Sequence, residues 1–269
     1  MISGYLDTLK VSISPNRVKI HNSSLCKFYL GDNFKTLTKG DTKKAIEKIS
    51  NSLHLPFELA SVSKLEFGRN IILKHSEGLY YPYLGESQHL NRLPTNNGLY
   101  YQNSLRSYVL YGKVKEQKLS GEPIPSIYAN ANVLRIELRL LKRICKEMNL
   151  PVFLASQLYE ERIYSELVKK WKDEYLAITK TKSKLDTIKP TGSKREFEQM
   201  LASMALLDLG SDFAQVKVKE WLKTSKITKK QAYDLRATIT DLTKYNVGEG
   251  GNELIDELNE KVKDAAVYW

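Results

Sequence analysis

The segment Val133–Leu140 (VLRIELRL) constrains the fold more than any other part of this chain. From Leu134 onward its apolar and charged side chains alternate strictly, which is the period of a β-strand with one buried face. The apolar members are Leu134, Ile136, Leu138 and Leu140. The charged members are Arg135, Glu137 and Arg139. The pattern therefore predicts a strand that buries one face and presents a carboxylate between two guanidinium groups on the other.

A second segment, Ser107–Glu116 (SYVLYGKVKE), is also predicted to be extended. In an alternating strand Tyr111 and Lys113 share one face, whereas Tyr108 and Leu110 lie on the other. The two segments together supply a phenol, a cation and a carboxylate. These are the groups needed to cut a phosphodiester through a covalent link to tyrosine.

The net charge indicates which class of molecule the protein is expected to bind. The chain has 42 Lys and Arg against 31 Asp and Glu, which gives a charge of +11 and a pI near 9.3. A protein of that charge attracts polyanions, and nucleic acid is the commonest one inside cells. The composition therefore favours a nucleic-acid-binding protein.

Cysteine use and hydropathy indicate a cytoplasmic protein. Cys26 and Cys145 are the only cysteines, and they form neither a disulfide framework nor a zinc-binding pattern. No apolar run reaches the length that spans a bilayer, so no membrane partner is expected. The start, Met1–Asp7, lacks a basic region followed by an apolar one, so export is not expected either.

Residues 1–150 are predicted to form a first domain of strands with one early helix. Asp41 is the expected N-cap of a helix from Thr42 to about Leu53. Residues 78–97 hold prolines, glycines and asparagines and predict an irregular loop with short strand pieces. The expected strands are Tyr5–Ser14, one or two within Asn16–Leu30, Leu59–Phe67, Leu99–Glu116 and Asn132–Ile144.

After Pro151 the apolar periodicity becomes helical, so residues 151–269 are predicted to form a second, helical domain. Thr179–Lys194 is rich in Lys, Thr, Ser and Gly and predicts a linker. Strands followed by helices indicate the α+β class. The expected helices are Val152–Ile178, Lys194–Leu209, Asp212–Lys223, Lys229–Tyr245 and a last one from Asn252.

Two of these helices, Asp212–Lys223 and Lys229–Tyr245, suit a DNA-binding helix-turn-helix. Thr228 and Gln231 form a capping-box pattern at the start of the second. A helical cap with a basic exterior is an equally good interpretation. No glycine-rich phosphate loop is present, so ATP-driven unwinding is not expected of this chain. The cations expected to face phosphates are Lys226, Lys229, Lys230 and Arg236.

Several short motifs, taken in order, resemble a known family. They are Leu6-Asp-Thr-Leu9, Val62-Ser-Lys-Leu-Glu66, Tyr111-Gly-Lys-Val-Lys-Glu116, Leu134-Arg-Ile-Glu-Leu-Arg139 and Asn149-Leu-Pro151. This order resembles the gene II/X-type replication initiators of filamentous single-stranded DNA phages and the related plasmid rolling-circle initiators. The resemblance covers about residues 5 to 151.

That family is similar in architecture to the HUH nucleases, so the resemblance implies an antiparallel sheet whose central strands carry the site, with flanking helices. It places Tyr111 at the catalytic tyrosine and Glu66 and Glu137 at two acidic positions, where they would bind Mg²⁺ or Mn²⁺. The chain departs from the family pattern by having Glu instead of Asp at position 66 and Lys instead of Arg at position 64. The two-histidine metal clamp of HUH enzymes is not visible in the sequence.

The chemistry of these side chains agrees with those roles. A phenol with a pKa near 10 is a poor nucleophile at neutral pH. A nearby cation, either Lys113 or a metal ion, would favour the phenolate. Arg135 and Arg139 would hold adjacent phosphates by bidentate hydrogen bonds. Lys113 is therefore expected beside Tyr111 in the catalytic site, and the two arginines are expected to bind DNA.

Two positions stay open. Tyr108 competes with Tyr111, because the two tyrosines would share a face if the segment were helical. Asp7 falls on the apolar side of its strand, with Leu9 and Val11, unless a bulge turns it round.

We therefore expect a site-specific single-strand DNA endonuclease and ligase that nicks an origin through a tyrosyl 5′-phosphate link and starts rolling-circle replication of a phage or plasmid. Its partners would be duplex and single-stranded origin DNA and the polymerase and helicase of a bacterial host, in the cytoplasm. The alternative is a non-catalytic origin-binding or transcription-regulating protein. A mobilisation relaxase would share the same chemistry.

Overall fold

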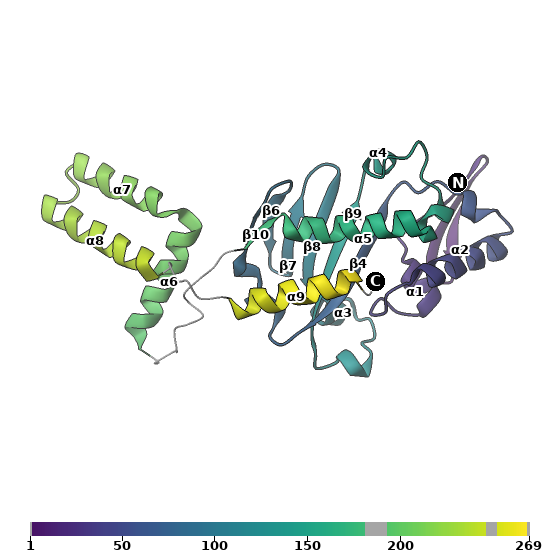
Figure 1. Ribbon diagram of the computed structural model, residues 1–269, viewed down its shortest axis with the longest axis horizontal. Helices are drawn as coiled ribbons and strands as arrows, with labels where there is room; N and C mark the ends of the chain where they lie inside the picture. The colour runs from purple at the N-terminus through teal and green to yellow at the C-terminus, as the bar shows by residue number, and fades with distance from the viewer. Residues whose placement is uncertain (1, 181–192, 246–251, 268–269) are drawn as a thin grey trace. The chain divides into compact units, whose positions relative to one another are not determined.

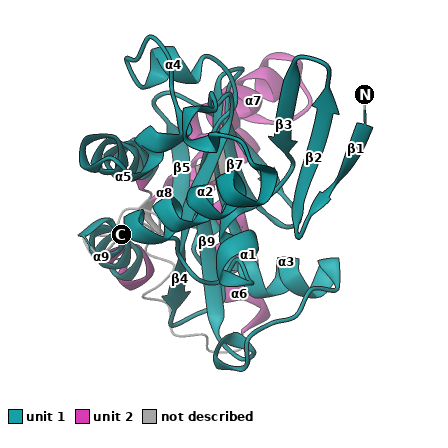
Figure 2. Cartoon of the chain, turned by 90° about the vertical axis from the view of Figure 1, so that its right-hand side faces the viewer, with its two compact units in different colours: residues 1–179, 257–269 teal, residues 180–256 magenta. Residues whose placement is uncertain are grey.

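The structure, a computed structural model, describes residues 2–180, 193–245 and 252–267 and divides into two compact units (Figure 2). Unit 1 contains residues 1–179 and 257–269, and unit 2 contains residues 180–256. Unit 2 is thus inserted, in sequence, between two parts of unit 1. The boundary expected at residue 150 lies inside unit 1.

Unit 1 is built on a five-stranded sheet with the strand order β4-β9-β8-β7-β6 (Figure 1). Every neighbouring pair in it is antiparallel. This sheet, its flanking helices and the helical C-terminal region confirm the predicted α+β class. The strands are β4 (Leu65–Leu73), β6 (Asn91–Thr95), β7 (Gly98–Gln102), β8 (Arg106–Gly112) and β9 (Asn132–Leu140).

One face of this sheet is apolar and packs against helix α5 (Glu161–Leu176). The apolar side chains predicted for this face of β9 are all buried, namely Leu134, Ile136, Leu138 and Leu140. On α5, Trp171 is fully buried, and its Nε1 donates a hydrogen bond of 3.1 Å to the Ile136 carbonyl oxygen. The helix is shorter than the predicted Val152–Ile178 because an η5 turn, Ala155–Tyr159, precedes it.

The C-terminal helix α9 (Glu253–Val267) returns to unit 1 beside α5. Figure 2 shows α5 and α9 on one side of the sheet, with α1 and α3 on the other. Glu257 accepts hydrogen bonds from the Tyr80 hydroxyl at 2.6 Å and from the Lys74 backbone N–H at 2.9 Å. The Tyr175 hydroxyl of α5 donates to Asn259 at 2.7 Å. These buried polar contacts fix the end of the chain to the sheet.

The N-terminus forms a separate three-stranded antiparallel sheet of β1 (Ile2–Leu6), β2 (Leu9–Ser14) and β3 (Arg17–His21). The single strand predicted over Tyr5–Ser14 is therefore wrong. Asp7 adopts a left-handed φ of 50° and lies in the turn between β1 and β2. A short polar residue tolerates that conformation, so a tight hairpin replaces the expected continuous strand.

Helix α2 (Lys39–Leu53) starts earlier than predicted because its N-cap is Thr38 and not Asp41. The Thr38 hydroxyl accepts from the Asp41 N–H at 3.1 Å, and the Asp41 carboxylate accepts from the Thr38 N–H at 3.2 Å. Asp41 is thus the third residue of a capping box, a role that satisfies two free backbone donors at once.

Several predicted loops and strands contain other elements. The segment Leu99–Glu116, predicted to be extended, contains β7 and β8 and then turns into helix α3. Residues 78–97, predicted to be irregular, include β5 and β6. The remaining elements of unit 1 are α1 (Leu25–Leu30), α3 (Lys113–Ser120), α4 (Ile144–Glu147), β5 (Leu84–Ser87), β10 (Ile178–Lys180), η1 (Phe57–Leu59), η2 (Glu77–Leu79), η3 (Tyr81–Tyr83) and η4 (Ser126–Tyr128).

Unit 2 contains helices α6 (Lys194–Leu209), α7 (Ser211–Lys223) and α8 (Lys229–Tyr245), close to the predicted ranges. The predicted capping box at α8 is confirmed, since Thr228 N–H donates to Gln231 at 2.9 Å and Gln231 N–H donates to the Thr228 hydroxyl at 3.2 Å. The linker predicted over Thr179–Lys194 falls mainly on residues 181–192, outside the described residues. A small core holds the helices together through Val218, Ala232 and Ile239.

Candidate active site on the polar face of the sheet

The three strands β8, β9 and β4 bring the predicted site residues onto one face of the sheet. Tyr111 of β8 is in register with Arg135 of β9, and Arg139 of β9 is in register with Glu66 of β4. Glu137 lies between the two arginines in the alternation of β9. Residues in register across an antiparallel pair point to the same side. All five side chains therefore lie opposite the apolar core, which is the side predicted for the three charged residues of β9.

Glu137 is the centre of this cluster. Its Oε1 accepts a hydrogen bond of 3.0 Å from the Tyr111 hydroxyl and one of 2.6 Å from Arg135 Nε. Its Oε2 accepts from Arg139 Nε at 3.1 Å and from Arg139 Nη2 at 2.7 Å. The side chain is only 10% exposed. Two guanidinium groups thus hold one buried carboxylate by charge-assisted hydrogen bonds.

The two arginines control the ionisation of Glu137. Burial by itself would raise the pKa of this carboxyl group, but the charges and hydrogen bonds of Arg135 and Arg139 lower it from 4.5 to about 2. Glu137 is therefore ionised at neutral pH. While both arginines hold it, the carboxylate is a weak proton acceptor.

Tyr111 is a protonated phenol in this arrangement. Burial and the negative charge of Glu137 raise the pKa of its hydroxyl well above 10, and the positive charge of Arg135 opposes this only in part. The hydroxyl donates its hydrogen bond to Glu137 and keeps its proton. Attack on a phosphate requires a change of charge that removes this proton.

Lys113 does not share a strand face with Tyr111, so that prediction is wrong. Strand β8 ends at Gly112, and Lys113 is the first residue of helix α3. Its ammonium group is 4% exposed and pairs with Glu116 at 2.6 Å. It also lies 5.7 Å from the centre of the Phe34 ring. The helix turns the cation toward these neighbours, and its predicted catalytic role stays a prediction.

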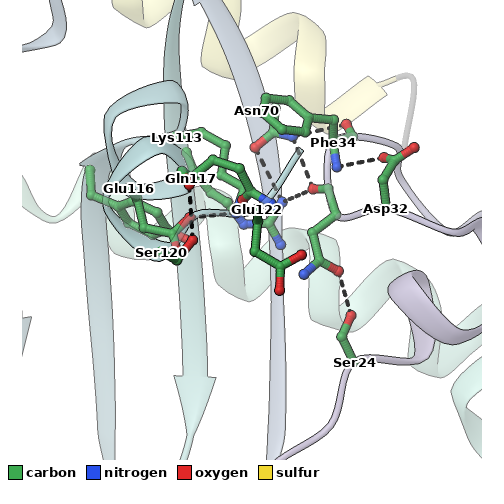
Figure 3. A network of polar contacts seen from close by, with 12 residues as sticks. Ser24, Asp32, Phe34, Asn70, Lys113, Glu116, Gln117, Ser120 and Glu122 are labelled. Atoms are coloured by element: carbon green, nitrogen blue, oxygen red, sulfur yellow. Dashed lines mark hydrogen bonds and ion pairs between the residues drawn. The ribbon is translucent and has the colours of Figure 1, made fainter. Parts of the chain in front are cut away.

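A residue that the sequence analysis missed, Asn70, fixes the position of Arg135 (Figure 3). Arg135 Nη1 donates to Asn70 Oδ1 and to the Asn33 carbonyl oxygen, both at 3.2 Å. Asn70 Nδ2 donates in turn to the carbonyl oxygens of Asn33 and Phe34, at 3.3 Å and 2.9 Å. The segment that follows α1 is thereby joined to the sheet. The alternation of β4 places Asn70 on the same face as Glu66, but an amide in a strand does not by itself indicate a site.

Gly68, also missed, makes room for Glu137. The two residues are in register across β4 and β9. A Cβ atom at position 68 would lie 2.8 Å from Glu137 Cγ and 2.3 Å from the Ile136 carbonyl oxygen. A side chain at this position would therefore push the central carboxylate out of place.

Glu66 and Glu137, the two carboxylates expected to bind Mg²⁺ or Mn²⁺, both lie next to Arg139. Arg139 contacts Glu137 and also lies 3.6 Å from Glu66, whose side chain is 58% exposed. Among the described residues, no group of three or more acidic, histidine or cysteine side chains suits a metal ion. With both Glu137 oxygens already bonded to arginines, this donor set does not fit a divalent cation as it is arranged.

The structure also locates Tyr108 and Asp7, the two positions that the sequence left open. Tyr108 lies on the apolar face of β8 and is fully buried, next to Tyr175 and Glu174 of α5. Burial raises the pKa of its hydroxyl well above 10. Tyr111 and Tyr108 therefore point to opposite sides of the sheet, as expected for a strand. Asp7 is exposed in its turn and pairs with Lys48 at 3.2 Å.

The remaining predicted DNA-binding residues, Lys229 and Lys230, belong to unit 2. Both side chains are exposed in the first turn of α8. Residues 224–228 connect α7 to α8, and the two helices pack through Val218, Ala232 and Ile239. This agrees with a helix pair that has an apolar inner side and cations at the start of its second helix.

These features define an α+β protein with a tyrosine, a carboxylate and two arginines on the polar side of an antiparallel sheet. A family model, described as the N-terminal region of a phage replication-associated protein, matches residues 10–174, more than half of the chain. The chain belongs to this phage family of replication-associated proteins. The matched region contains β8, β9, β4 and the whole Glu137 cluster.

No curated protein and no solved structure matches the chain. Among the helices of the described residues, none has the length and apolar character needed to cross a bilayer.

Proposed function

We propose that this protein nicks and rejoins one strand of an origin and so starts rolling-circle replication of a phage or plasmid. The observation that carries the proposal is the hydrogen bond of 3.0 Å between the Tyr111 hydroxyl and Glu137. Arg135 and Arg139 contact the same carboxylate. A nucleophile, a proton acceptor and two phosphate-binding cations thus meet on one sheet face.

Substrate binding would supply the change of charge that Tyr111 needs. A DNA phosphate that accepts hydrogen bonds from Arg135 and Arg139 competes with Glu137 for the same N–H groups. When those bonds are lost, burial raises the pKa of Glu137. The carboxylate then becomes a general base that takes the phenol proton, and the arginines stabilise the charge on the phosphate under attack.

The bonds balance without an external energy source. Tyr111 Oη forms a bond to phosphorus, and the bond from phosphorus to the 3′ oxygen breaks. The 3′ oxygen takes up a proton and leaves as a hydroxyl that host polymerase extends, while host helicase separates the strands. In the reverse reaction a 3′ hydroxyl gives up its proton and attacks the phosphorus, the bond from phosphorus to Tyr111 Oη breaks, and the tyrosine takes up a proton as the circle closes. Because the tyrosyl phosphodiester conserves the bond energy, rejoining needs no ATP.

Unit 2 would hold the duplex part of the origin. Lys229 and Lys230 are exposed at the start of α8. The packing of α8 against α7 suits a helix-turn-helix. Contacts from such lysines to phosphates position a protein on DNA without reading its sequence. Local melting of the origin would then present one strand to the site on unit 1.

The direct test uses supercoiled plasmid carrying the cognate origin, and origin DNA labelled in the strand segment on the 3′ side of the nick, whose 5′ phosphate would become attached to tyrosine. Wild-type protein should relax the plasmid and become covalently attached to the label, whereas Tyr111→Phe should do neither. Parallel reactions with EDTA, Mg²⁺ or Mn²⁺ test the metal dependence that the family resemblance predicts. Intact plasmid and no adduct with wild-type protein under all of these conditions would refute the proposal.

A second candidate is a non-catalytic origin-binding or transcription-regulating protein. One observation favours it: the Tyr111 proton is held by Glu137, and both Glu137 oxygens are occupied by arginines. Such a closed network also suits a purely structural role. A binder would shift origin DNA in a gel and leave every phosphodiester intact.

A further inference from the structure

The N-terminal sheet of β1, β2 and β3 has a polar face that the proposed reaction does not use. Hydrogen bonds run across it from Ser3 to Ser12 at 3.0 Å and from Ser12 to His21 at 2.8 Å. The register places Tyr5, Lys10 and His21 in one row of this face. We name this surface the hairpin face. Its members are Ser3, Tyr5, Lys10, Ser12, Ser14, Arg17, Lys19 and His21.

The hairpin face is basic. It carries Lys10, Arg17 and Lys19, and within the described residues none of these cations forms an ion pair with a carboxylate. The only acid in residues 1–24 is Asp7, which lies in the turn and pairs with Lys48. Three uncompensated cations on one small sheet attract a polyanion.

The hairpin face also exposes an aromatic ring. The Tyr5 side chain is 75% exposed on the edge strand β1, beside Lys10 in the same row. An exposed tyrosine among cations fits an unpaired base better than a duplex, because stacking needs an accessible base plane. Duplex DNA offers its phosphates but keeps its bases stacked on one another.

The other face of this sheet packs inward only at the end nearer the Asp7 turn. Leu9 and Val11 are buried there, and Leu9 contacts the cluster that includes Phe28 and Ile49. At the opposite end of the same face Ile2, Ile13 and Val18 are exposed. On the hairpin face Tyr5, Arg17 and Lys19 are exposed.

A short chain of contacts links the hairpin face to the candidate active site. His21 ends β3, and Ser24 follows as the N-cap of α1. The Ser24 hydroxyl bonds to Asn33 Oδ1 at 2.6 Å, and the Asn33 carbonyl oxygen accepts from Arg135. The Ser24 end of this network is visible in Figure 3. The end of β3 is therefore connected to Arg135 through Ser24 and Asn33.

We propose that the hairpin face binds single-stranded DNA next to the scissile phosphate, with Lys10, Arg17 and Lys19 on consecutive phosphates and Tyr5 stacked on a base. The proposal rests on the proposed function, because it assigns a track for the strand that the site would cut. It adds a strand-holding surface within unit 1 that is separate from the lysines of α8.

The test compares two triple variants of the full-length protein that lose the same charge. One is Lys10→Ala with Arg17→Ala and Lys19→Ala. The control is Lys43→Ala with Lys44→Ala and Lys169→Ala, which removes exposed lysines of α2 and α5.

Fluorescence anisotropy with a labelled single-stranded oligonucleotide gives Kd at several salt concentrations. For the hairpin variant we expect Kd to rise about tenfold or more and the slope of log K against log salt to fall by about 2, as three phosphate contacts imply. The control should change Kd less than about twofold.

Tyr5 gives an independent measurement. Tyr5→Ala should weaken binding of the single strand about 5-fold or more, whereas Tyr5→Phe should bind as wild type does, since it keeps the ring. Thermal melting followed by circular dichroism checks that each variant is folded. If the triple variant melts early, the single variants Arg17→Ala and Lys19→Ala replace it, each with an expected slope change of about 0.7.

The outcomes separate this inference from the proposed function. Equal Kd values and slopes for the hairpin variant and the control would overturn the inference, as would a loss of affinity confined to duplex DNA. A failure of wild-type protein to nick any DNA would overturn the proposed function alone. In that case the hairpin variant still reports whether this surface binds a single strand.

Discussion

Tyr111 and Tyr108 are three residues apart in one strand, yet their hydroxyl groups have opposite surroundings. Tyr111 donates to Glu137 on the polar face. The Tyr108 hydroxyl is buried and has no hydrogen-bond partner among the described residues. A phenol needs a nearby base and access to a phosphate to act as a nucleophile. Of these two tyrosines, only Tyr111 is hydrogen-bonded to a carboxylate.

This contrast predicts opposite effects of the same substitution. Tyr111→Phe should abolish the covalent DNA adduct while costing about 1 kcal/mol of stability, the value of one hydrogen bond. Tyr108→Phe should leave the adduct unchanged and stabilise the fold or leave it unaffected, because it removes a buried group without a partner. Adduct formation on denaturing gels and urea unfolding measure the two effects. If the adduct persists in Tyr111→Phe but is lost in Tyr108→Phe, the nucleophile is Tyr108 and not Tyr111.

The clamp on Glu137 predicts a dependence of stability on acid. The pKa of Glu137 is lowered in the folded protein, so its contribution to stability is present above pH 4.5 and is lost as the pH falls toward 2. A lowering from 4.5 to about 2 corresponds to about 3 kcal/mol.

We therefore expect the free energy of unfolding of wild-type protein to exceed that of Glu137→Gln most strongly above pH 4.5. The difference should shrink by up to about 3 kcal/mol as the pH approaches 2. Urea unfolding of both proteins across this range measures it. A difference that stays constant would show that the arginines do not hold this carboxylate.

At the level of the elements, β4 has a glycine, Gly68, opposite Glu137 of β9, and the missing side chain leaves space for the carboxylate. Gly68→Ala should destabilise the fold by about 1–3 kcal/mol and reduce adduct formation, because the new methyl group meets the Ile136 carbonyl oxygen and Glu137. Gly4→Ala in β1 is the matched control, since a Cβ there has no atom within 4 Å. Its stability should stay within about 0.5 kcal/mol of wild type. Equal effects of the two substitutions would argue against a packing role for Gly68.

The elements also show what the sequence could and could not predict. Strand β9 was predictable because its alternation places Glu137 between its arginines. The register then brought Tyr111 beside Arg135 and Glu66 beside Arg139. The helix over Lys113–Ser120 was not predicted. Gly112 and the charged residues after it show no apolar periodicity that would distinguish a helix from a strand. Asn70 was missed because a lone amide carries no signal until the pairing of β4 with β9 brings it to Arg135.

The hairpin turn at Asp7 illustrates a second limit. Leu9, Val11 and Ile13 alternate as a strand should, and the prediction extended this alternation backward through the turn. Only the left-handed backbone of Asp7 reveals that the chain reverses there. Side-chain periodicity reports which face is buried, but it does not report a tight reversal between two strands of similar pattern.

For the whole molecule, the return of α9 to unit 1 predicts which truncations the protein tolerates. Ending the chain after Asp256 removes Glu257, the partner of Tyr80, and the buried side chains of Leu258 and Val262. Each aliphatic side chain contributes about 1.5–3 kcal/mol, so unit 1 should melt at a clearly lower temperature. Deleting residues 194–245 instead should leave its melting temperature within a few degrees of wild type.

Thermal denaturation followed by circular dichroism and by near-UV absorbance compares these two deletions. The internal deletion keeps α9 and leaves residues 181–193 and 246–252 as a connecting chain. If it destabilises unit 1 as much as the terminal truncation does, the two units do not fold independently.

Because unit 2 is one contiguous stretch of sequence with unit 1 on both sides of it, a single exchange of genetic material between relatives could replace it whole. Such a swap would leave the part of α9 from Glu257 onward and the sheet residues that surround Glu137 untouched. Under the proposed function, descendants would in this way acquire a new replication target in one step of inheritance and keep the proposed cutting site.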